Sequence, residues 1–259
     1  QRAGLGWFGR NTMLLHPRRG SWFFLGTLLL EIDLAPSPPF TRDHCGTCNA
    51  CVTACPTGAL LGRDEHGAPV IDATRCISYL TIENRGAIPR ELRPLMGNRV
   101  FGCDICQEVC PWNGPKLVQL AGESGFAARA AGEAPSGVQH EAGASTSHPG
   151  TASPSLIALL ETALDEVAWD SFSRGSAIRR AGRAGFARNV CVALGNWSSE
   201  EAVRVLSRAL SDPDASVRAH AAWALGRVGS AEARSALSVH ASVETDACVL
   251  EELSAAMAT

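Results

Sequence analysis

Residues 45–56 read CGTCNACVTACP, and residues 103–111 read CDICQEVCP. The first run has the pattern C-x2-C-x2-C-x3-C-P, which is typical of bacterial proteins that hold [4Fe–4S] clusters. The second run repeats the end of that pattern with one cysteine fewer. Cys76 is the only other cysteine in this part of the chain, so we expect it to supply the missing ligand. The sequence therefore predicts two iron–sulfur clusters.

The order of the cysteines predicts that the two clusters exchange their last ligands. Three cysteines at two-residue gaps wrap a loop around one cube, whereas the fourth, followed by Pro56, cannot turn back to it. The predicted metal ligands are Cys45, Cys48, Cys51 and Cys110 for cluster one, and Cys55, Cys76, Cys103 and Cys106 for cluster two.

Zinc sites and disulfides are the alternatives, because C-x2-C pairs also bind zinc. Zinc does not require eight cysteines in this order, and a disulfide scaffold spreads its cysteines along a small chain. Of the ten cysteines, only Cys191 and Cys248 lie outside this region, and we expect both to be buried as small apolar residues.

The chain has 259 residues, a formal net charge of −3 and 46% hydrophobic residues, which is enough for more than one packed core. Its fold class is predicted as α+β and multidomain. Residues 1–40 alternate glycine turns with apolar runs, like the last strand and helix of an α/β domain. Residues 41–115 are expected to form a ferredoxin-like domain. Residues 116–154, rich in Ala, Gly, Ser and Pro, form the predicted linker.

Residues 155–259 have a helical pattern and an internal repeat. Ala193-Leu194-Gly195 recurs as Ala224-Leu225-Gly226, and Ser199 recurs as Ser230. The pattern predicts pairs of helices that cross at small residues, with Asp212-Pro213-Asp214 as turn and N-cap. It is typical of a HEAT-like α-solenoid.

The chain starts with Gln1 and enters a glycine-rich motif at once, so we expect a further N-terminal part upstream. No secretory signal pattern is present, and the longest apolar run, residues 22–30, is too short to cross a membrane. We expect a cytoplasmic monomer.

Several segments outside the cysteine runs carry a resemblance to a known family. They are GLGWFGRNT (residues 4–12), GSWFFLG (20–26), CISYLTIE (76–83), GNRVFGCDICQ (97–107), CPWN (110–113) and GSAIRRA (175–181). Together they resemble the epoxyqueuosine reductases. The resemblance covers nearly the whole chain except residues 121–154.

The resemblance implies an oxidoreductase that reduces epoxyqueuosine in tRNA to queuosine. In that family a cobalamin lies between an N-terminal α/β domain and the ferredoxin-like domain, and the clusters pass single electrons to its cobalt. An external ferredoxin- or flavodoxin-like protein is the expected electron donor. Residues 1–40 would be the end of the cobalamin-binding domain. The proton donor of the family is an aspartate upstream of residue 4, so no catalytic residue is assigned here and this chain alone is expected to be inactive.

The resemblance also implies which residues contact the cobalamin. Arg10, Asn11 and Thr12 match the loop beside the corrin, and Ser78, Cys103 and Asp104 match segments that face it. The alternative is that Asn11, Thr12 and Ser78 only cap turns and helices.

No acidic residue falls between Asp170 and Glu200, whereas five arginines do. Guanidinium groups pair well with phosphate, so this stretch predicts a tRNA-binding surface on the solenoid. The predicted tRNA contacts are Arg85, Arg174, Arg179, Arg180, Arg183 and Arg188. The alternative is a solvated helix face.

Two other functions are consistent with the cysteine pattern. One is a reductive dehalogenase with the same pair of cofactors, although such an enzyme has no use for a basic helical repeat. The other is a non-enzymatic ferredoxin module fused to a protein-binding solenoid, which the motif at residues 4–12 argues against.

Overall fold

The computed structural model describes residues 1–114 and 154–258. The predicted linker therefore lies outside the described residues except for Pro154. The described chain divides into two compact units. The cysteine unit contains residues 1–76 and 103–114, and the helical unit contains residues 77–102 and 154–258. All eight clustered cysteines lie in the cysteine unit.

The cysteine unit is built from two small antiparallel hairpins and short helices. In the first hairpin, β1 (Trp7–Phe8) pairs with β2 (Leu14–Leu15). In the second, β3 (Leu60–Arg63) pairs with β4 (Pro69–Ile71), with a bulge between Leu60 and Gly62. The helical pieces are α1 (Ala50–Ala54), η1 (Ala73–Arg75), α3 (Ile105–Glu108) and η3 (Pro111–Asn113). Each helical piece adjoins or contains one of the predicted ligands.

The expected helix in residues 1–40 is not present. Residues 23–40 run as an extended segment without regular structure, and Phe24 and Leu29 are 85% and 94% exposed. A short helix is marginal in water unless an apolar face is buried against a neighbour. No described element covers this run, and the Ser37-Pro38-Pro39 sequence cannot continue a helix.

The helical unit contains the predicted repeat. Its helices are α2 (Ile77–Ile82), η2 (Pro94–Met96), α5 (Leu156–Leu164), α6 (Glu166–Ser173), η5 (Ala177–Ala181), α7 (Arg183–Trp197), η6 (Glu200–Ala202), α8 (Val203–Ala209), α9 (Ala215–Val228), α10 (Ala231–Ala241) and α11 (Ala247–Met257). Ser199 and Ser230 cap equivalent helix starts, as their spacing predicts, and Asp214 caps α9. None of the described helices is long and apolar enough to cross a membrane.

Glycine allows the repeat helices to pack closely. A Cβ on Gly195 would lie 2.5 Å from the Trp223 ring, and one on Gly226 would lie 2.7 Å from Ala256. Both contacts are shorter than carbon atoms tolerate, so any side chain here would push neighbouring helices apart. The prediction that small residues mark the helix crossings is confirmed.

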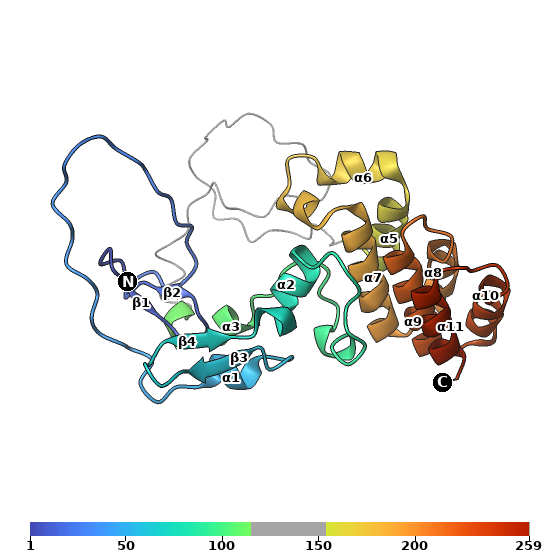
Figure 1. Cartoon of the computed structure of the whole chain (residues 1–259), viewed down its shortest axis with the longest axis horizontal. Helices are drawn as coiled ribbons and strands as arrows, with labels where there is room; N and C mark the ends of the chain where they lie inside the picture. Colours follow the sequence, from blue (N-terminus) through green and yellow to red (C-terminus); the bar gives the residue numbers. More distant parts are fainter. Residues whose placement is uncertain (115–153, 259) are drawn as a thin grey trace. The chain divides into compact units, whose positions relative to one another are not determined.

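Residues 77–102 separate Cys76 from Cys103 in sequence, yet they pack against the solenoid. Ile77, Leu80, Ile88 and Met96 are buried there, and Figure 1 shows α2 beside α7. Much of this segment is irregular, so its backbone needs hydrogen-bond partners from elsewhere.

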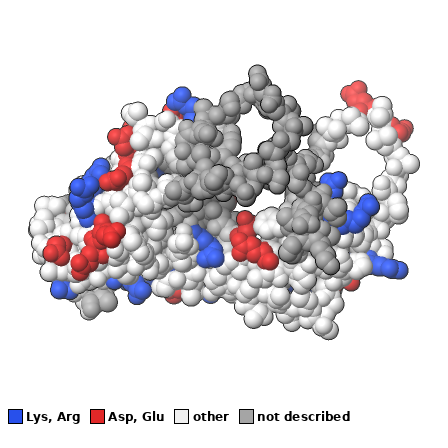
Figure 2. All heavy atoms as spheres, turned by 180° about the vertical axis from the view of Figure 1, so that it is seen from behind, with Lys and Arg blue, Asp and Glu red and all other residues white. Residues whose placement is uncertain are grey.

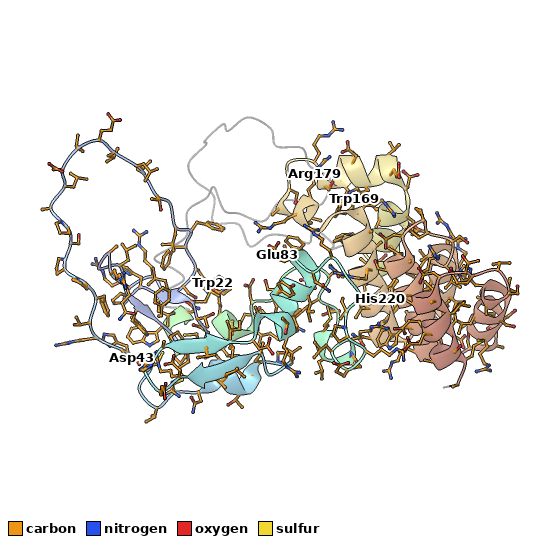
Figure 3. The ribbon with its side chains drawn as sticks, viewed as in Figure 1. Trp22, Asp43, Glu83, Trp169, Arg179 and His220 are labelled. Carbon is orange, nitrogen blue, oxygen red and sulfur yellow. The ribbon has the colours of Figure 1, made fainter. Side chains whose placement is uncertain are left out.

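Side chains of α7 and α9 supply those partners. Asn189 donates to the carbonyls of Thr81 and Val100, at 2.7 and 2.9 Å. Asn196 donates in the same way to Arg93 and Gly97, at 2.8 Å each. From α9, His220 (Figure 3) accepts the Ile88 backbone N–H at 3.1 Å and contacts the Ser216 carbonyl.

The hydrogen bonds of His220 require a neutral ring. Because Nε2 accepts from Ile88, Nδ1 must carry the proton that is donated to Ser216. Burial, with Arg93 and Arg188 nearby, lowers the pKa of His220 well below 6.5. A pKa that is lower in the folded than in the unfolded state makes the unfolded state bind more protons as the pH falls.

We therefore predict that the helical unit loses stability below about pH 6.5, by up to about 1.4 kcal/mol per pH unit. The midpoint of urea unfolding, followed by circular dichroism, should fall between pH 6.5 and 5. His220→Gln should be less stable at pH 8 but should lose this slope. A His220→Gln protein that retains the full slope would place the responsible group elsewhere.

Candidate iron–sulfur site

Four cysteines from distant parts of the sequence line one hollow. Cys45, Cys48, Cys51 and Cys110 border a hollow of about 40 Å³ that is partly open to solvent. These are the four predicted ligands of cluster one. Within residues 1–114 and 154–258, no three His, Cys, Asp or Glu side chains converge on a point that would hold a single metal ion.

The other predicted ligands gather around Cys106. Burial, together with the neighbouring thiols of Cys103, Cys51, Cys76 and Cys55, raises the pKa of Cys106 to about 12. Three of these four are the predicted partners of Cys106 in cluster two. Cys51, a predicted ligand of cluster one, is the fourth, so the two groups of thiols are neighbours.

Burial also raises the pKa of Cys51 and Cys110, and nearby cysteines add to the effect. Cys55 differs. Burial acts to raise its pKa, but hydrogen bonds from the Leu60 backbone, Thr57 and Ala59 outweigh it and lower the pKa. Neighbouring thiols with raised pKa values lose their protons when a bound cation stabilises the thiolates. The donor set therefore suits a metal group with soft sulfur ligands.

The turn between β1 and β2 ties both cysteine motifs together. From this turn, Arg10 donates to the Gly46 carbonyl at 2.8 Å and to the Asn49 side chain, in the first motif. Asn11 is 1% exposed and donates to the Cys106 carbonyl at 3.2 Å, in the second motif. Arg10 and Asn11 thus contact the cysteine loops in this structure.

The remaining predicted cobalamin contacts have different surroundings. The Thr12 side chain is half-buried. Its backbone is in the left-handed region at φ +65°, which is a strained conformation for a β-branched residue. Asp104 is exposed, and its carboxylate accepts a hydrogen bond from Gln107 at 2.9 Å. Cys103 lies among the thiols near Cys106. Ser78 is half-buried on α2 of the helical unit.

An aromatic cluster beside the cysteines was not predicted. The Trp7 ring lies 4.9 Å from both His44 and Trp112, and 5.8 Å from Phe40. His44 precedes Cys45 and Trp112 follows Cys110 by two residues, so these rings border the cluster-one thiols. The sequence places His44 and Trp112 close to predicted ligands, and this could have indicated an aromatic group beside the cysteines. Sequence spacing alone cannot show that Trp7 packs against them.

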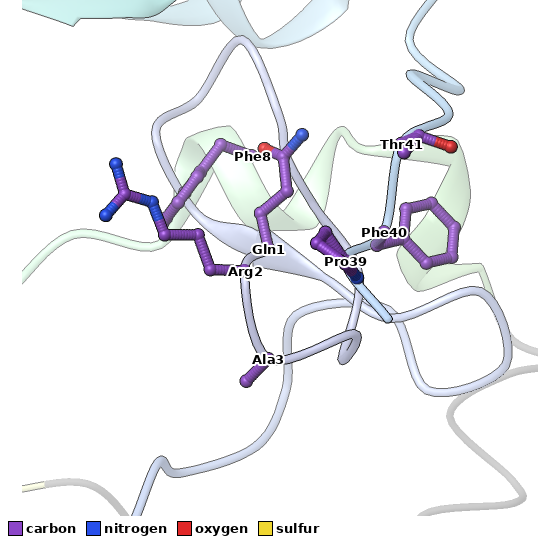
Figure 4. A pocket seen from close by; sticks show the side chains of 7 residues that line it. All are labelled: Gln1, Arg2, Ala3, Phe8, Pro39, Phe40 and Thr41. Atoms are coloured by element: carbon purple, nitrogen blue, oxygen red, sulfur yellow. The ribbon is translucent and has the colours of Figure 1, made fainter. Parts of the chain in front are cut away.

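A second hollow, of about 740 Å³, lies at the start of the chain. Figure 4 shows its lining, which comes from residues 1–3, Phe8 and residues 39–41. Arg2 supplies the only guanidinium of this lining, and the other side chains are apolar, amide or hydroxyl groups. Nothing in this set points to catalysis.

The predicted tRNA arginines fall into two groups. The arginines of the first group form hydrogen bonds or ion pairs within the helical unit. Arg188 is 1% exposed and donates to the carbonyls of Leu80, Asn84 and Gly86. Arg183 pairs bidentately with the buried Asp212, at 2.7 and 2.9 Å. Arg85 donates to the carbonyls of Arg180 and Ala181, at 3.0 Å each.

The second group is exposed. Arg174 and Arg179 both pair with Asp170, and Arg180 pairs with Glu83 at 2.7 Å. Figure 3 shows Arg179 and Glu83 on the helical unit. Surface pairs of this kind are weak, so a phosphate can compete for these arginines. Arg174, Arg179 and Arg180 are therefore exposed with only carboxylate partners among the described residues, whereas Arg85 is exposed but already donates to two carbonyls.

The acidic partners also change the charge of the surface. The sequence stretch lacks acidic residues, but folding brings Asp170 and Glu83 to the exposed arginines. On the face that Figure 2 shows, basic and acidic side chains are interspersed. Cys191 is buried as expected, whereas the expectation for Cys248 is wrong, because Cys248 is exposed at the start of α11.

Two family models match the chain. The 4Fe–4S double cluster binding domain matches residues 44–113, and HEAT repeats match residues 174–258. The fold and the gathered thiols therefore define an iron–sulfur protein with a helical-repeat domain.

Epoxyqueuosine reductases are similar in sequence to this chain. The epoxyqueuosine reductase of Pseudomonas aeruginosa is 42% identical over 88% of this chain and 56% of that protein. The enzyme of Escherichia coli is 41% identical over 88% of this chain and 52% of that protein. This chain is similar to the epoxyqueuosine reductases, and it spans about half the length of these relatives.

Solved structures agree with the sequence comparison. An epoxyqueuosine reductase from Bacillus subtilis, with its catalytic aspartate loop swung out of the active site, matches with a TM-score of 0.76 at 31% identity. An epoxyqueuosine reductase with an epoxyqueuosine-modified tRNA-Tyr stem loop matches with a TM-score of 0.72 at 29% identity. Each match covers 99% of this chain and 61% of the other chain.

We predict that Cys76→Ala loses one cluster and keeps the other. After anaerobic reconstitution, iron should fall from about eight to about four atoms per chain. Cys248→Ala, which removes an exposed thiol of the helical unit, is the matched control and should retain all the iron. A Cys76→Ala protein with an unchanged iron content would show that Cys76 is not a ligand.

Proposed function

We propose that this chain forms the electron-transfer and tRNA-binding part of an epoxyqueuosine reductase, which reduces epoxyqueuosine in tRNA to queuosine. The convergence of Cys45, Cys48, Cys51 and Cys110 on one hollow, with four more cysteines beside it, carries the proposal. The family resemblance supports the reaction, and the relative bound to a modified stem loop supports the substrate.

The proposed ligands are Cys45, Cys48, Cys51 and Cys110 for cluster one and Cys55, Cys76, Cys103 and Cys106 for cluster two. The protein would hold the clusters close together through Cys51, whose thiol neighbours both groups. An external one-electron donor would reduce them. Because tRNA is the substrate, we also propose a cytoplasmic location.

Cobalamin is the further cofactor that the family implies. When bound, it would supply a cobalt centre that is reduced one electron at a time and acts on the strained epoxide. The proposed contacts in the cysteine unit are Arg10, Asn11, Thr12, Cys103 and Asp104, of which all but Asn11 are at least partly accessible, and Ser78 is the proposed contact in the helical unit. Arg10 and Asn11 also hold the cysteine loops.

We predict that the protein carrying this chain converts epoxyqueuosine to queuosine in a tRNA stem loop, given cobalamin and a one-electron reductant. Mass spectrometry would follow the loss of one oxygen atom from the nucleoside. Cys110→Ala should abolish conversion, while Cys248→Ala should retain it. Release of halide from a haloarene without turnover of epoxyqueuosine would contradict the proposal, and so would full activity of Cys110→Ala.

The exposed arginines generate a separate prediction. Arg179→Ala combined with Arg180→Ala should weaken stem-loop binding roughly tenfold and lower the salt dependence of log Kd by about two, one for each lost phosphate contact. Fluorescence anisotropy at several salt concentrations measures both quantities. Arg204→Ala with Arg208→Ala removes two exposed arginines of α8 and is the matched control. Equal weakening by both pairs would mean that only net charge matters.

A further inference from the structure

Arg10 occupies a turn with little conformational freedom. The Gly9 N–H donates to the Met13 carbonyl and the Thr12 N–H to the Gly9 carbonyl, at 2.9 Å each. A Cβ on Gly9 would lie 2.6 Å from the Leu15 side chain, so only glycine fits there. The turn therefore fixes the direction in which the Arg10 side chain leaves the backbone.

The guanidinium of Arg10 is attached to the first cysteine loop. One terminal nitrogen donates to the Gly46 carbonyl at 2.8 Å, and the other donates to the Asn49 side chain. Gly46 and Asn49 flank Cys48 in sequence. These two hydrogen bonds fix the position of the guanidinium group relative to the first cysteine loop.

The third nitrogen of the Arg10 guanidinium, Nε, has no hydrogen-bond acceptor among the described residues. Its N–H is buried. Arg10 also lines the hollow that Cys45, Cys48, Cys51 and Cys110 border. Leaving a buried donor unsatisfied costs about 1–3 kcal/mol, so an acceptor supplied by a bound group would stabilise this site.

Arg10 is the one lining residue of this hollow whose charge is permanent. An iron–sulfur cluster held by four thiolates is anionic and gains a further negative charge when it takes up an electron. Charge and hydrogen bonds near the sulfur atoms are among the factors that set its reduction potential. A nearby cation and N–H donor favour the reduced form.

We propose that Arg10 raises the reduction potential of cluster one, and so makes that cluster easier to reduce than it would be without the guanidinium group. One electron arrives from the external donor, and no bond forms or breaks. The inference rests on the proposed cluster ligands, and it gives Arg10 a role other than the corrin contact that the family resemblance implies.

A redox titration of the reconstituted chain, followed by electron paramagnetic resonance, tests this role. Arg10→Gln should keep both clusters but shift one of the two midpoint potentials to a more negative value. Arg10→Lys keeps the charge but loses the planar fork and the Nε–H, so its midpoint should lie between those of Arg10→Gln and the wild type. Should Arg10→Gln fail to bind iron, Arg10→Lys alone decides, and a wild-type potential for it would overturn the proposal.

Arg63 supplies a matched control in the same unit. It pairs with Asp43 at 2.9 Å, its Nε is also buried with no hydrogen-bond partner in the described part of the chain, and it does not line the hollow. Arg63→Gln should therefore leave both potentials unchanged. Equal shifts in Arg63→Gln and Arg10→Gln, or no shift in either, would overturn the proposal. A wild-type chain that binds no iron would overturn the cluster assignment itself, which distinguishes the two failures.

Discussion

The irregular backbone of residues 80–102 depends on side chains of the solenoid for its hydrogen bonds. Arg188, Asn189 and Asn196 on α7 together donate to seven of its carbonyl groups. His220 on α9 accepts one of its N–H groups. A buried carbonyl without a partner costs free energy, so these side chains allow an irregular segment to be buried. The helical repeat therefore supports the backbone of residues 80–102.

Burial also explains why charged residues appear in the interior of the helical unit. Arg93 donates to Glu252 at 2.8 and 3.1 Å and to the Ile88 carbonyl, and its guanidinium lies over the Trp223 ring. Breaking such a pair on one side costs about 3–5 kcal/mol because the partner stays buried and uncompensated. Arg183 and Asp212 form a second ion pair of this kind in the helical unit. Several arginines of this unit thus serve packing rather than recognition.

In the cysteine unit, an arginine contacts a cysteine loop instead of forming a buried ion pair. Arg10 and Asn11 are adjacent in sequence, yet each contacts a different cysteine motif. The hairpin that carries them lacks a large core of its own, and Trp7 and Leu15 are its fully buried side chains. Gathered thiols and a few side-chain bonds to backbone groups hold this unit, which is what a small domain built around a metal group requires.

The sequence alone determined the grouping of cysteines and the architecture of the repeat. Local spacing grouped Cys45, Cys48 and Cys51, and the C-x3-C-P ending of both motifs predicted that Cys110 joins them, before the structure placed these four around one hollow. The same holds for Gly195 and Gly226, whose period marks helix crossings. Only the tertiary structure decided which arginines are exposed, that residues 77–102 belong with the solenoid, and that residues 23–40 form no helix. Burial and ion pairing depend on contacts between residues far apart in sequence, such as Arg188 with Leu80 or Arg180 with Glu83, and no local pattern encodes them.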